Sequence, residues 1–104
     1  MSFGLSRGKE FDVGTIGIEG ASLPALPDSV NTSPQSAWTD PRDWFEHPAR
    51  PFEIEIGSGK GTFLVQQAEI EPETNFLGFE WAKEFWAYAA DRVRRRALKN
   101  VKLV

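Results

Sequence analysis

The chain has 104 residues, 40% of them hydrophobic and 26% charged, and a formal net charge of −3. This length and balance predict one small domain, and the mildly acidic charge gives no global case for nucleic-acid binding, so an RNA partner would need a local basic patch. The absence of cysteine and the single histidine exclude disulfides and metal clusters built from those residues, and no apolar run approaches the ~20 residues that span a bilayer.

Residues 1–51 are rich in glycine and proline and show little helical periodicity. This composition predicts loops and turns rather than an independent core. We expect the segment to lie across a larger domain as an irregular N-terminal extension, pinned there by scattered apolar side chains. These are Phe3, Phe11, Val13, Ile16, Ile18, Trp38, Trp44 and Phe45.

Three local features stand out within this extension. Residues 13–18 are compatible with a short edge strand, and Asp40 before Pro41 is typical of a capped short helix. Trp38 and Trp44 have two interpretations, stacking on a nucleic-acid base or packing on the core, and we favour packing.

From residue 52 onward the pattern predicts alternating strands and helices. Residues 52–56 read F-E-I-E-I, which indicates a short buried strand of a covered sheet. A helix is expected over 62–70, with an apolar face and a proline just after its end. A second strand is expected over 75–80, a second helix over about 82–98 with Asn100 as its C-cap, and a third strand from 101 to 104. This order predicts half of a Rossmann-like α/β domain over residues 52–104.

A glycine-spaced turn, Gly57-Ser58-Gly59-Lys60-Gly61, follows the first strand. Glycine lets the chain bend sharply and lets a ligand approach the backbone, and the helix that begins here directs unpaired N–H groups to the same place. Glu80 ends the second strand nineteen residues after Gly61. A carboxylate about twenty residues after such a turn is typical of a nucleotide pocket in which it binds a ribose.

The spacing of the glycines in the turn limits the class of ligand that it can bind. The dinucleotide fingerprint is G-x-G-x-x-G, whereas this turn reads G-x-G-x-G, and Glu55 immediately before it would repel a pyrophosphate and favour a cationic ligand. A Walker P-loop is excluded, because its first glycine would fall at Ile54 and its hydroxyl residue at Gly61. The turn resembles the first motif of class I methyltransferases, whose cofactor S-adenosyl-L-methionine carries a sulfonium and an ammonium but no phosphate. A purely structural glycine turn is the alternative.

Two blocks resemble one family within that class, the tRNA (guanine-N7)-methyltransferases. They are residues 53–61, E-I-E-I-G-S-G-K-G, and residues 75–80, N-F-L-G-F-E. Residues 100–103, N-V-K-L, resemble the family's next strand, so the resemblance covers about residues 52–104. It implies a Rossmann-like class I methyltransferase fold, S-adenosyl-L-methionine as cofactor, N7 of a guanine in tRNA as methyl acceptor, a cytoplasmic location and no metal.

The resemblance also implies roles for individual residues. The cofactor-binding set that it implies is Glu55, Gly57, Ser58, Gly59, Gly61, Glu80 and Trp81. Glu55 would lie beside the methionyl end, Glu80 would hold the ribose hydroxyls, and the backbone of Trp81 would lie against the adenine. The family's catalytic aspartate would follow Val104, so we expect residues 1–104 to be inactive alone.

Two alternative functions and one question about a basic helix end remain at this point. The chain could serve a class I methyltransferase with a different substrate, or a Rossmann-like nucleotide-binding module without chemistry. The last turns of the second helix carry Arg92, Arg94, Arg95 and Arg96. These arginines either complement the helix dipole and solvate the helix, which we favour, or contact RNA phosphates.

Overall fold

The computed structural model describes residues 10–37 and 39–104, so the expectations for Phe3 and Trp38 lie outside the described residues. Short 3-10 turns come first in the chain, at Gly20–Ser22, Asp28–Asn31, Pro34–Ala37 and Pro41–Trp44. The regular elements follow, namely β1 (Phe52–Ile56), α1 (Thr62–Ile70), β2 (Asn75–Phe79), α2 (Lys83–Arg95) and β3 (Val101–Leu103). The predicted order of strands and helices is confirmed, with boundaries within three residues of those expected.

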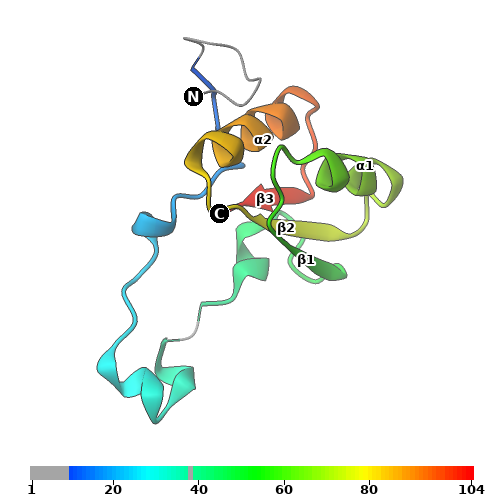
Figure 1. The fold of residues 1–104 in the computed structure, drawn as a ribbon. Helices are drawn as coiled ribbons and strands as arrows, with labels where there is room; N and C mark the ends of the chain where they lie inside the picture. The colour runs from blue at the N-terminus through cyan, green and yellow to red at the C-terminus, as the bar shows by residue number, and fades with distance from the viewer. Residues whose placement is uncertain (1–9, 38) are drawn as a thin grey trace.

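The three strands form one parallel sheet in the order β1-β2-β3. The register pairs Phe52 with Asn75 at one end of β1 and Ile56 with Phe79 at the other, and β3 pairs with β2 from Phe76 onward. Both helices lie on one side of the sheet, because each connects two neighbouring parallel strands (Figure 1). The chain is therefore a small α/β unit with a parallel three-stranded sheet.

The core lies between the helices and the sheet. Helix α1 buries Leu64, Val65 and Ala68 on one face, as its periodicity predicted. Helix α2 and the strands complete the cluster with Trp86, Ala89, Ala90, Val93, Phe76, Val101 and Leu103. This packed core supports the carboxyl ends of β1 and β2, which the glycine turn and Glu80 follow.

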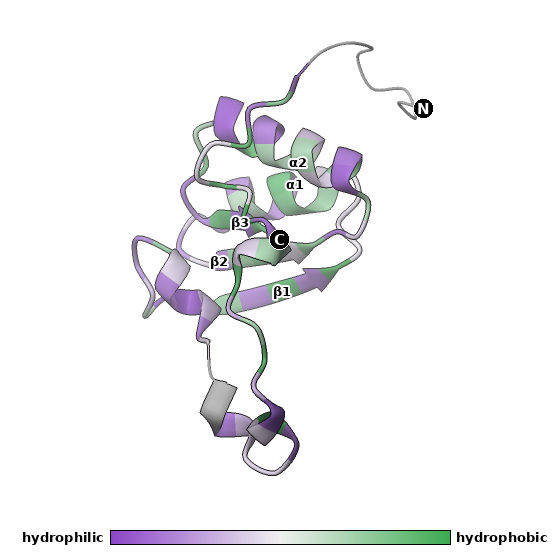
Figure 2. Cartoon of the chain, turned by 90° about the vertical axis from the view of Figure 1, so that its left-hand side faces the viewer, coloured by the Kyte–Doolittle hydropathy of each residue, from purple (hydrophilic) through white to green (hydrophobic). Residues whose placement is uncertain are grey.

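The expectation of a buried first strand is wrong. Ile54 is 53% exposed and Ile56 is 78% exposed. Glu55 is paired with Gly78 and lies on the face of the sheet that the helices cover. Because side chains alternate along a strand, the two isoleucines point to the opposite face. Figure 2 shows this alternation as hydrophilic and hydrophobic bands along β1. No strand of the described residues pairs with the outer edge of β1.

Helix α2 ends earlier than its pattern predicted. Arg95 is its last residue, and Ala97 adopts a left-handed φ of 54°, which takes the chain out of the helix and leaves Ala97 exposed. Asn100 is therefore not a helix cap. Its buried amide donates to the carbonyls of Ala68, Glu71 and Thr74, and it fixes the chain between α1 and β2 to the start of β3.

The first described residues of the N-terminal extension lie against α2 and β3. The edge strand expected over 13–18 is reduced to a single parallel bridge between Gly17 and Leu103. Ile16 joins the core, and Phe11 makes an edge-on contact with Tyr88 at 5.5 Å between ring centroids. After residue 22 the chain runs away from the sheet and then returns to it (Figure 1).

The returning segment confirms the predicted cap. The Asp40 side chain accepts a hydrogen bond of 3.0 Å from the backbone of Arg42, and Pro41 begins the 3-10 turn. Trp44 is half-buried, whereas Phe45 is the buried aromatic residue and contacts Phe52 edge-on. Packing thus involves Phe45 more than the tryptophan that the sequence pointed to.

Candidate functional site

The glycine turn presents an open backbone surface at the carboxyl end of β1. Gly57 and Gly59 have φ values of 78° and 58°, which L side chains rarely adopt, and a Cβ added to either would meet no atom within 4 Å. A ligand can therefore reach this backbone without displacing protein atoms. Gly61 differs, because an added Cβ would lie 2.9 Å from that of Ala89, so this glycine serves the packing of α1 on α2.

Four of the five N–H groups of the turn, those of Gly57, Ser58, Gly59 and Gly61, donate within the protein. Gly57 and Ser58 donate to the Phe79 carbonyl at 2.7 and 3.1 Å, and Gly59 donates to Glu80 Oε1 at 2.6 Å. A phosphate cradle needs such N–H groups free to face the anion. The hydrogen-bond pattern thus agrees with the exclusion of a P-loop and favours a ligand that approaches the turn without a phosphate.

Glu80 ties three elements together at this edge. Its Oε1 accepts from Gly59 of the turn, and its Oε2 accepts from the Ala82 N–H at 2.8 Å, at the start of α2. A carboxylate has about four lone-pair sites, so each oxygen keeps one more acceptor position. Two acceptor positions on one carboxylate suit two neighbouring hydroxyl groups.

Two buried polar atoms near the turn have no hydrogen-bond partner in the described structure. They are Glu55 Oε1, at the end of β1, and Ser58 Oγ, within the turn. A buried acceptor without a donor is costly, and a carboxylate oxygen pairs best with a cationic donor. The turn can lie this close to β2 because Gly78 has no side chain: a Cβ there would collide with Ser58 Oγ and lie 2.5 Å from Leu64 Cδ1.

A pocket of about 240 Å³ opens beside Glu80 at the same edge of the sheet. Lys83 and Trp86 line it from the first turns of α2, and Trp81 lines it from just before that helix. Ile18 and Ala21 line it from the N-terminal extension. The Trp81 side chain is fully exposed, whereas Trp86 is buried and donates from Nε1 to the Leu103 carbonyl at 3.0 Å. Glu80 is the residue that this pocket shares with the glycine turn.

The structure thus brings together part of the set expected from the sequence. Glu55, Gly57, Ser58, Gly59 and Glu80 meet at the carboxyl ends of β1 and β2, and Trp81 follows directly. Sequence reasoning missed the pocket lining supplied by residues 18–21, by Lys83 and by Trp86. The helical spacing of Trp86 marked it for the core, but no motif marked residues 18–21, because their place depends on a distant pairing with β3.

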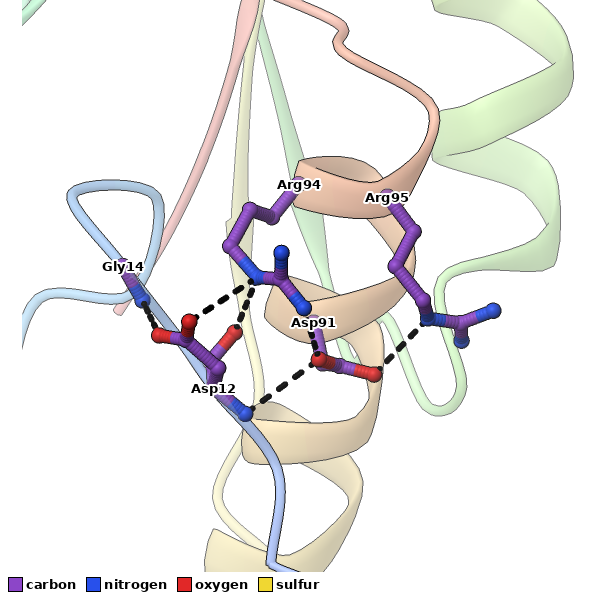
Figure 3. A network of polar contacts seen from close by, with 5 residues as sticks. All are labelled: Asp12, Gly14, Asp91, Arg94 and Arg95. Atoms are coloured by element: carbon purple, nitrogen blue, oxygen red, sulfur yellow. Dashed lines mark hydrogen bonds and ion pairs between the residues drawn. The ribbon is translucent and has the colours of Figure 1, made fainter.

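Arg92, Arg94 and Arg95 of α2, and Arg96 just after it, all have partners within the chain. Arg94 and Arg95 both donate to Asp91, at 2.8 and 2.9 Å (Figure 3). Arg92 donates to Thr62 Oγ1 at 3.1 Å, and Arg96 donates to Glu69 at 2.9 Å. These contacts favour a structural interpretation of the four arginines over an RNA-binding one.

Asp91 is the centre of this network and is only 5% exposed. Burial by itself raises the pKa of Asp91, but the hydrogen bonds from Arg94 and Arg95 and from the Asp12 N–H outweigh it and lower that pKa below its ordinary value. The buried carboxylate is thus fully partnered and lies away from the glycine turn. It holds the N-terminal extension to α2.

Two negative findings apply to the described ranges, residues 10–37 and 39–104. No group of three or more His, Cys, Asp or Glu side chains there could hold a metal ion. No helix in that part of the chain is long and apolar enough to cross a membrane.

Comparison with known proteins places these features among methyltransferases. A family model described as "Putative methyltransferase" matches residues 49–104. A tRNA (guanine-N(7)-)-methyltransferase of Streptococcus pneumoniae (strain 70585) is 35% identical over 82 residues, which cover 79% of this chain and 38% of that protein. One from Geobacillus kaustophilus (strain HTA426) is 34% identical over 88 residues, which cover 78% of this chain and 40% of the relative.

A third relative matches a shorter stretch of the chain at higher identity. The tRNA (guanine-N(7)-)-methyltransferase of Rhodopirellula baltica (strain DSM 10527 / NCIMB 13988 / SH1) is 42% identical over 55 residues, 53% of this chain and 20% of that protein. In each of these three relatives, the chain spans at most 40% of the relative's length.

Proposed function

The chain belongs to this methyltransferase family, and we propose that it supplies the cofactor-binding residues of an S-adenosyl-L-methionine-dependent enzyme that forms N7-methylguanine in tRNA. The observation that carries the proposal is the junction of Gly59 and Glu80, where an open glycine turn meets a carboxylate with two acceptor positions left. We further propose that the sheet is the first half of a Rossmann-like methyltransferase domain, and that the enzyme works in the cytoplasm.

The residues at this junction fit the cofactor. Glu80 would accept hydrogen bonds from the two ribose hydroxyls while keeping its bonds to Gly59 and Ala82. The unpartnered Oε1 of Glu55 would face the ammonium group of the methionyl part. The backbone at Gly57 and Gly59 would lie directly under the ligand, where a side chain would block it.

When bound, the cofactor supplies a methyl group on a sulfonium, and N7 of the acceptor guanine forms the new bond as sulfur keeps the electron pair of the broken one. Guanine N7 already carries a lone pair, so the protein need not remove a proton there. The work left to these residues is to fix the cofactor in one orientation and to keep it in place for an aligned approach.

Calorimetric titration tests the cofactor site. We expect the chain to bind S-adenosyl-L-methionine and not ATP, because the phosphates of ATP would lie beside the carboxylates of Glu55 and Glu80 and a turn in which most N–H groups already have partners. Glu80→Ala should weaken binding by about 1–3 kcal/mol, because the ribose hydroxyls lose a charged acceptor. The matched control is Glu71→Ala, an exposed glutamate at the other end of the sheet, which should leave affinity unchanged.

Glu80 also holds Gly59 and Ala82, so its loss affects folding as well as binding. Urea unfolding of Glu80→Ala and Glu80→Gln measures the effect of each change on stability. Affinity is then measured for each variant under conditions in which urea unfolding shows it to be folded, so that any loss of binding is not a loss of folding. Unchanged affinity in folded Glu80→Ala would contradict the assignment of the ribose site.

A transfer assay tests the methyl acceptor. A protein that carries this chain should move label from methyl-labelled S-adenosyl-L-methionine to an unmodified tRNA transcript. A matched transcript with 7-deazaguanosine in place of guanosine lacks N7 and should take up no label. Equal labelling of both transcripts would refute methylation at N7, and cofactor binding with labelling of neither would favour a different methyl acceptor.

A further inference from the structure

The N-terminal extension reaches the carboxyl edge of the sheet by running parallel to β3. Ile18 donates to the Leu103 carbonyl at 2.7 Å, Leu103 donates to the Ile16 carbonyl at 3.0 Å, and the bridge between Gly17 and Leu103 is parallel. A chain that pairs in this direction leaves the sheet at the same end as β2 and β3. Residues 18–21 therefore emerge beside Glu80, at the edge where parallel sheets bind their ligands.

We propose that Ile18–Ala21 form one wall of the site for the adenine nucleoside of the cofactor. The proposal rests on the proposed function and extends it to a part of the chain outside the matched residues 49–104. The wall residues line the 240 Å³ pocket together with Glu80 and Trp81. They would act as positioning residues, because they fix where the nucleoside lies and take no part in methyl transfer.

The wall is firmly attached to the rest of the chain. Arg94 Nε donates to the Asp12 carbonyl at 2.9 Å, and the Asp12 N–H donates to Asp91 (Figure 3). Lys102 Nζ donates to the Thr15 carbonyl at 2.7 Å. With Ile16 in the core, these contacts hold the part of the extension that leads into the bridge at Gly17. The wall therefore starts from an anchored point at Ile18, which donates to the Leu103 carbonyl, and a pre-positioned start lowers the entropic cost of binding.

Close packing at Gly17 sets the distance between the wall and α2. A Cβ at Gly17 would lie 2.8 Å from Val13 Cβ, 2.9 Å from Trp86 Cζ2 and 3.2 Å from Ala90 Cβ. Glycine here lets the backbone press against the Trp86 ring, which itself lines the pocket. The start of the wall and the Trp86 ring that lines the pocket thus pack directly against each other.

The chemistry of the pocket suits a nucleoside rather than a whole cofactor. Ligand sites for complete drug-sized molecules have volumes of roughly 300–1,000 Å³, and this pocket is smaller. Trp81 presents a fully exposed ring on which a base can stack, and Ile18 is a half-buried apolar neighbour. Glu80 lies between pocket and glycine turn, so a ribose bound to it would place the base in the pocket and the methionyl part toward the turn.

Filling the pocket from the wall tests the proposal. Ala21→Trp should weaken binding of S-adenosyl-L-methionine by about tenfold or more in calorimetry, because the new ring occupies the space of the base. The matched control is Leu26→Trp, which adds the same ring to a side chain that is 70% exposed and outside the pocket, and should leave affinity unchanged. Adenosine, titrated as a second probe, should lose affinity by the same factor.

A second variant covers the case in which Ala21→Trp does not fold. Gly20→Leu enlarges a second residue that lines the pocket, at a position where a Cβ meets no atom within 4 Å and the backbone is not left-handed. Reduced affinity in either folded variant supports the wall. Wild-type affinity in both overturns the wall and leaves the proposed function intact, whereas no binding by the unsubstituted chain overturns both.

Discussion

Two glycine-containing segments reach the carboxyl edge of the sheet, and they use glycine for opposite reasons. In residues 57–61, Gly57 and Gly59 have positive φ and open space around them. In residues 17–21, Gly17 has no positive φ, but an added Cβ would lie within 3.2 Å of three side chains. The first segment keeps its backbone open to a ligand, and the second fits its backbone tightly against α2.

This difference teaches that a glycine count does not by itself indicate a ligand site. A substitution in the open turn should mainly disturb backbone conformation and binding. A substitution at the packed glycine should mainly disturb folding and the place of the N-terminal extension. Variants at three glycines, with a fourth as control, and at one anchoring aspartate separate these effects.

The largest effect is expected at Gly78, which lies between the two segments. An added Cβ would collide with Ser58 of the turn and lie 2.8 Å from Leu103, the residue that pairs with the N-terminal extension. Gly78→Val should lower the free energy of unfolding by about 3 kcal/mol, measured by urea titration, because both segments must move. A loss below about 1 kcal/mol would mean that the core accommodates the side chain, contrary to this account.

Gly17→Val should cost about 2 kcal/mol of unfolding free energy, since side-chain atoms of Trp86 and Ala90 must give way. Gly20→Val is the control, because a Cβ at that position meets nothing, and its effect should lie within about 0.5 kcal/mol. Equal losses of unfolding free energy in Gly17→Val and Gly20→Val would contradict the distinction between packed and open glycines.

Gly57→Ala should cost less, about 1 kcal/mol, because the new methyl has space but the φ of 78° becomes strained. Binding of S-adenosyl-L-methionine should fall much more than stability, since the methyl lies where the ligand would lie. Urea titration and calorimetry on one preparation compare the two. Wild-type affinity with reduced stability would assign this glycine to the structure of the turn alone.

The smallest effect is a pH dependence carried by Asp91, which anchors the extension and not the turn. Its pKa is lowered in the folded chain, so its contribution to stability is present above the unfolded-state pKa of about 3.9 and is lost as the pH falls through the lower folded-state pKa. Unfolding free energies from about pH 5 to about pH 3 should therefore fall more steeply in the wild type than in Asp91→Asn.

Asp40 provides an internal reference for that comparison. Its pKa is also lowered, by hydrogen bonds from Arg42, so it adds the same acid dependence to both proteins. Parallel stability curves for the wild type and Asp91→Asn would show that the Asp91 network does not contribute to acid unfolding.

The second half of the chain was predictable because its signals are local. The F-E-I-E-I strand, the glycine spacing and the apolar face of α1 each specify structure within a few residues. The exposure of Ile54 and Ile56 was not predictable in this way, because alternation shows that a strand has two faces but not which of them a helix covers. The end of α2 was likewise decided by Ala97, whose left-handed backbone carries no glycine signal.

The residues of the candidate site also fall into those that local sequence predicts and those that depend on long-range contacts. Spacing places Glu55, the glycine turn and Glu80 at one edge of the sheet, because parallel strands bring their carboxyl ends together, whereas the role expected of Glu55 came from the family resemblance. The wall at Ile18–Ala21 depends on hydrogen bonds between residues more than eighty positions apart, as between Ile18 and Leu103, and no local pattern encodes such a pairing. The buried Asp91 with its two arginines was also hidden, since the sequence showed only a basic helix end.

The most direct test of the central claim, that the glycine turn and Glu80 bind the cofactor nucleoside, is an amide NMR titration of the isotopically labelled chain with S-adenosylhomocysteine. Gly59 and Ala82 both donate their N–H groups to the Glu80 carboxylate, so their amide signals should shift most when ribose hydroxyls reach that carboxylate. Signals at the opposite end of β2, such as that of Asn75, should stay in place. Saturable binding with shifts at that opposite end and none at Gly59 or Ala82 would contradict the account.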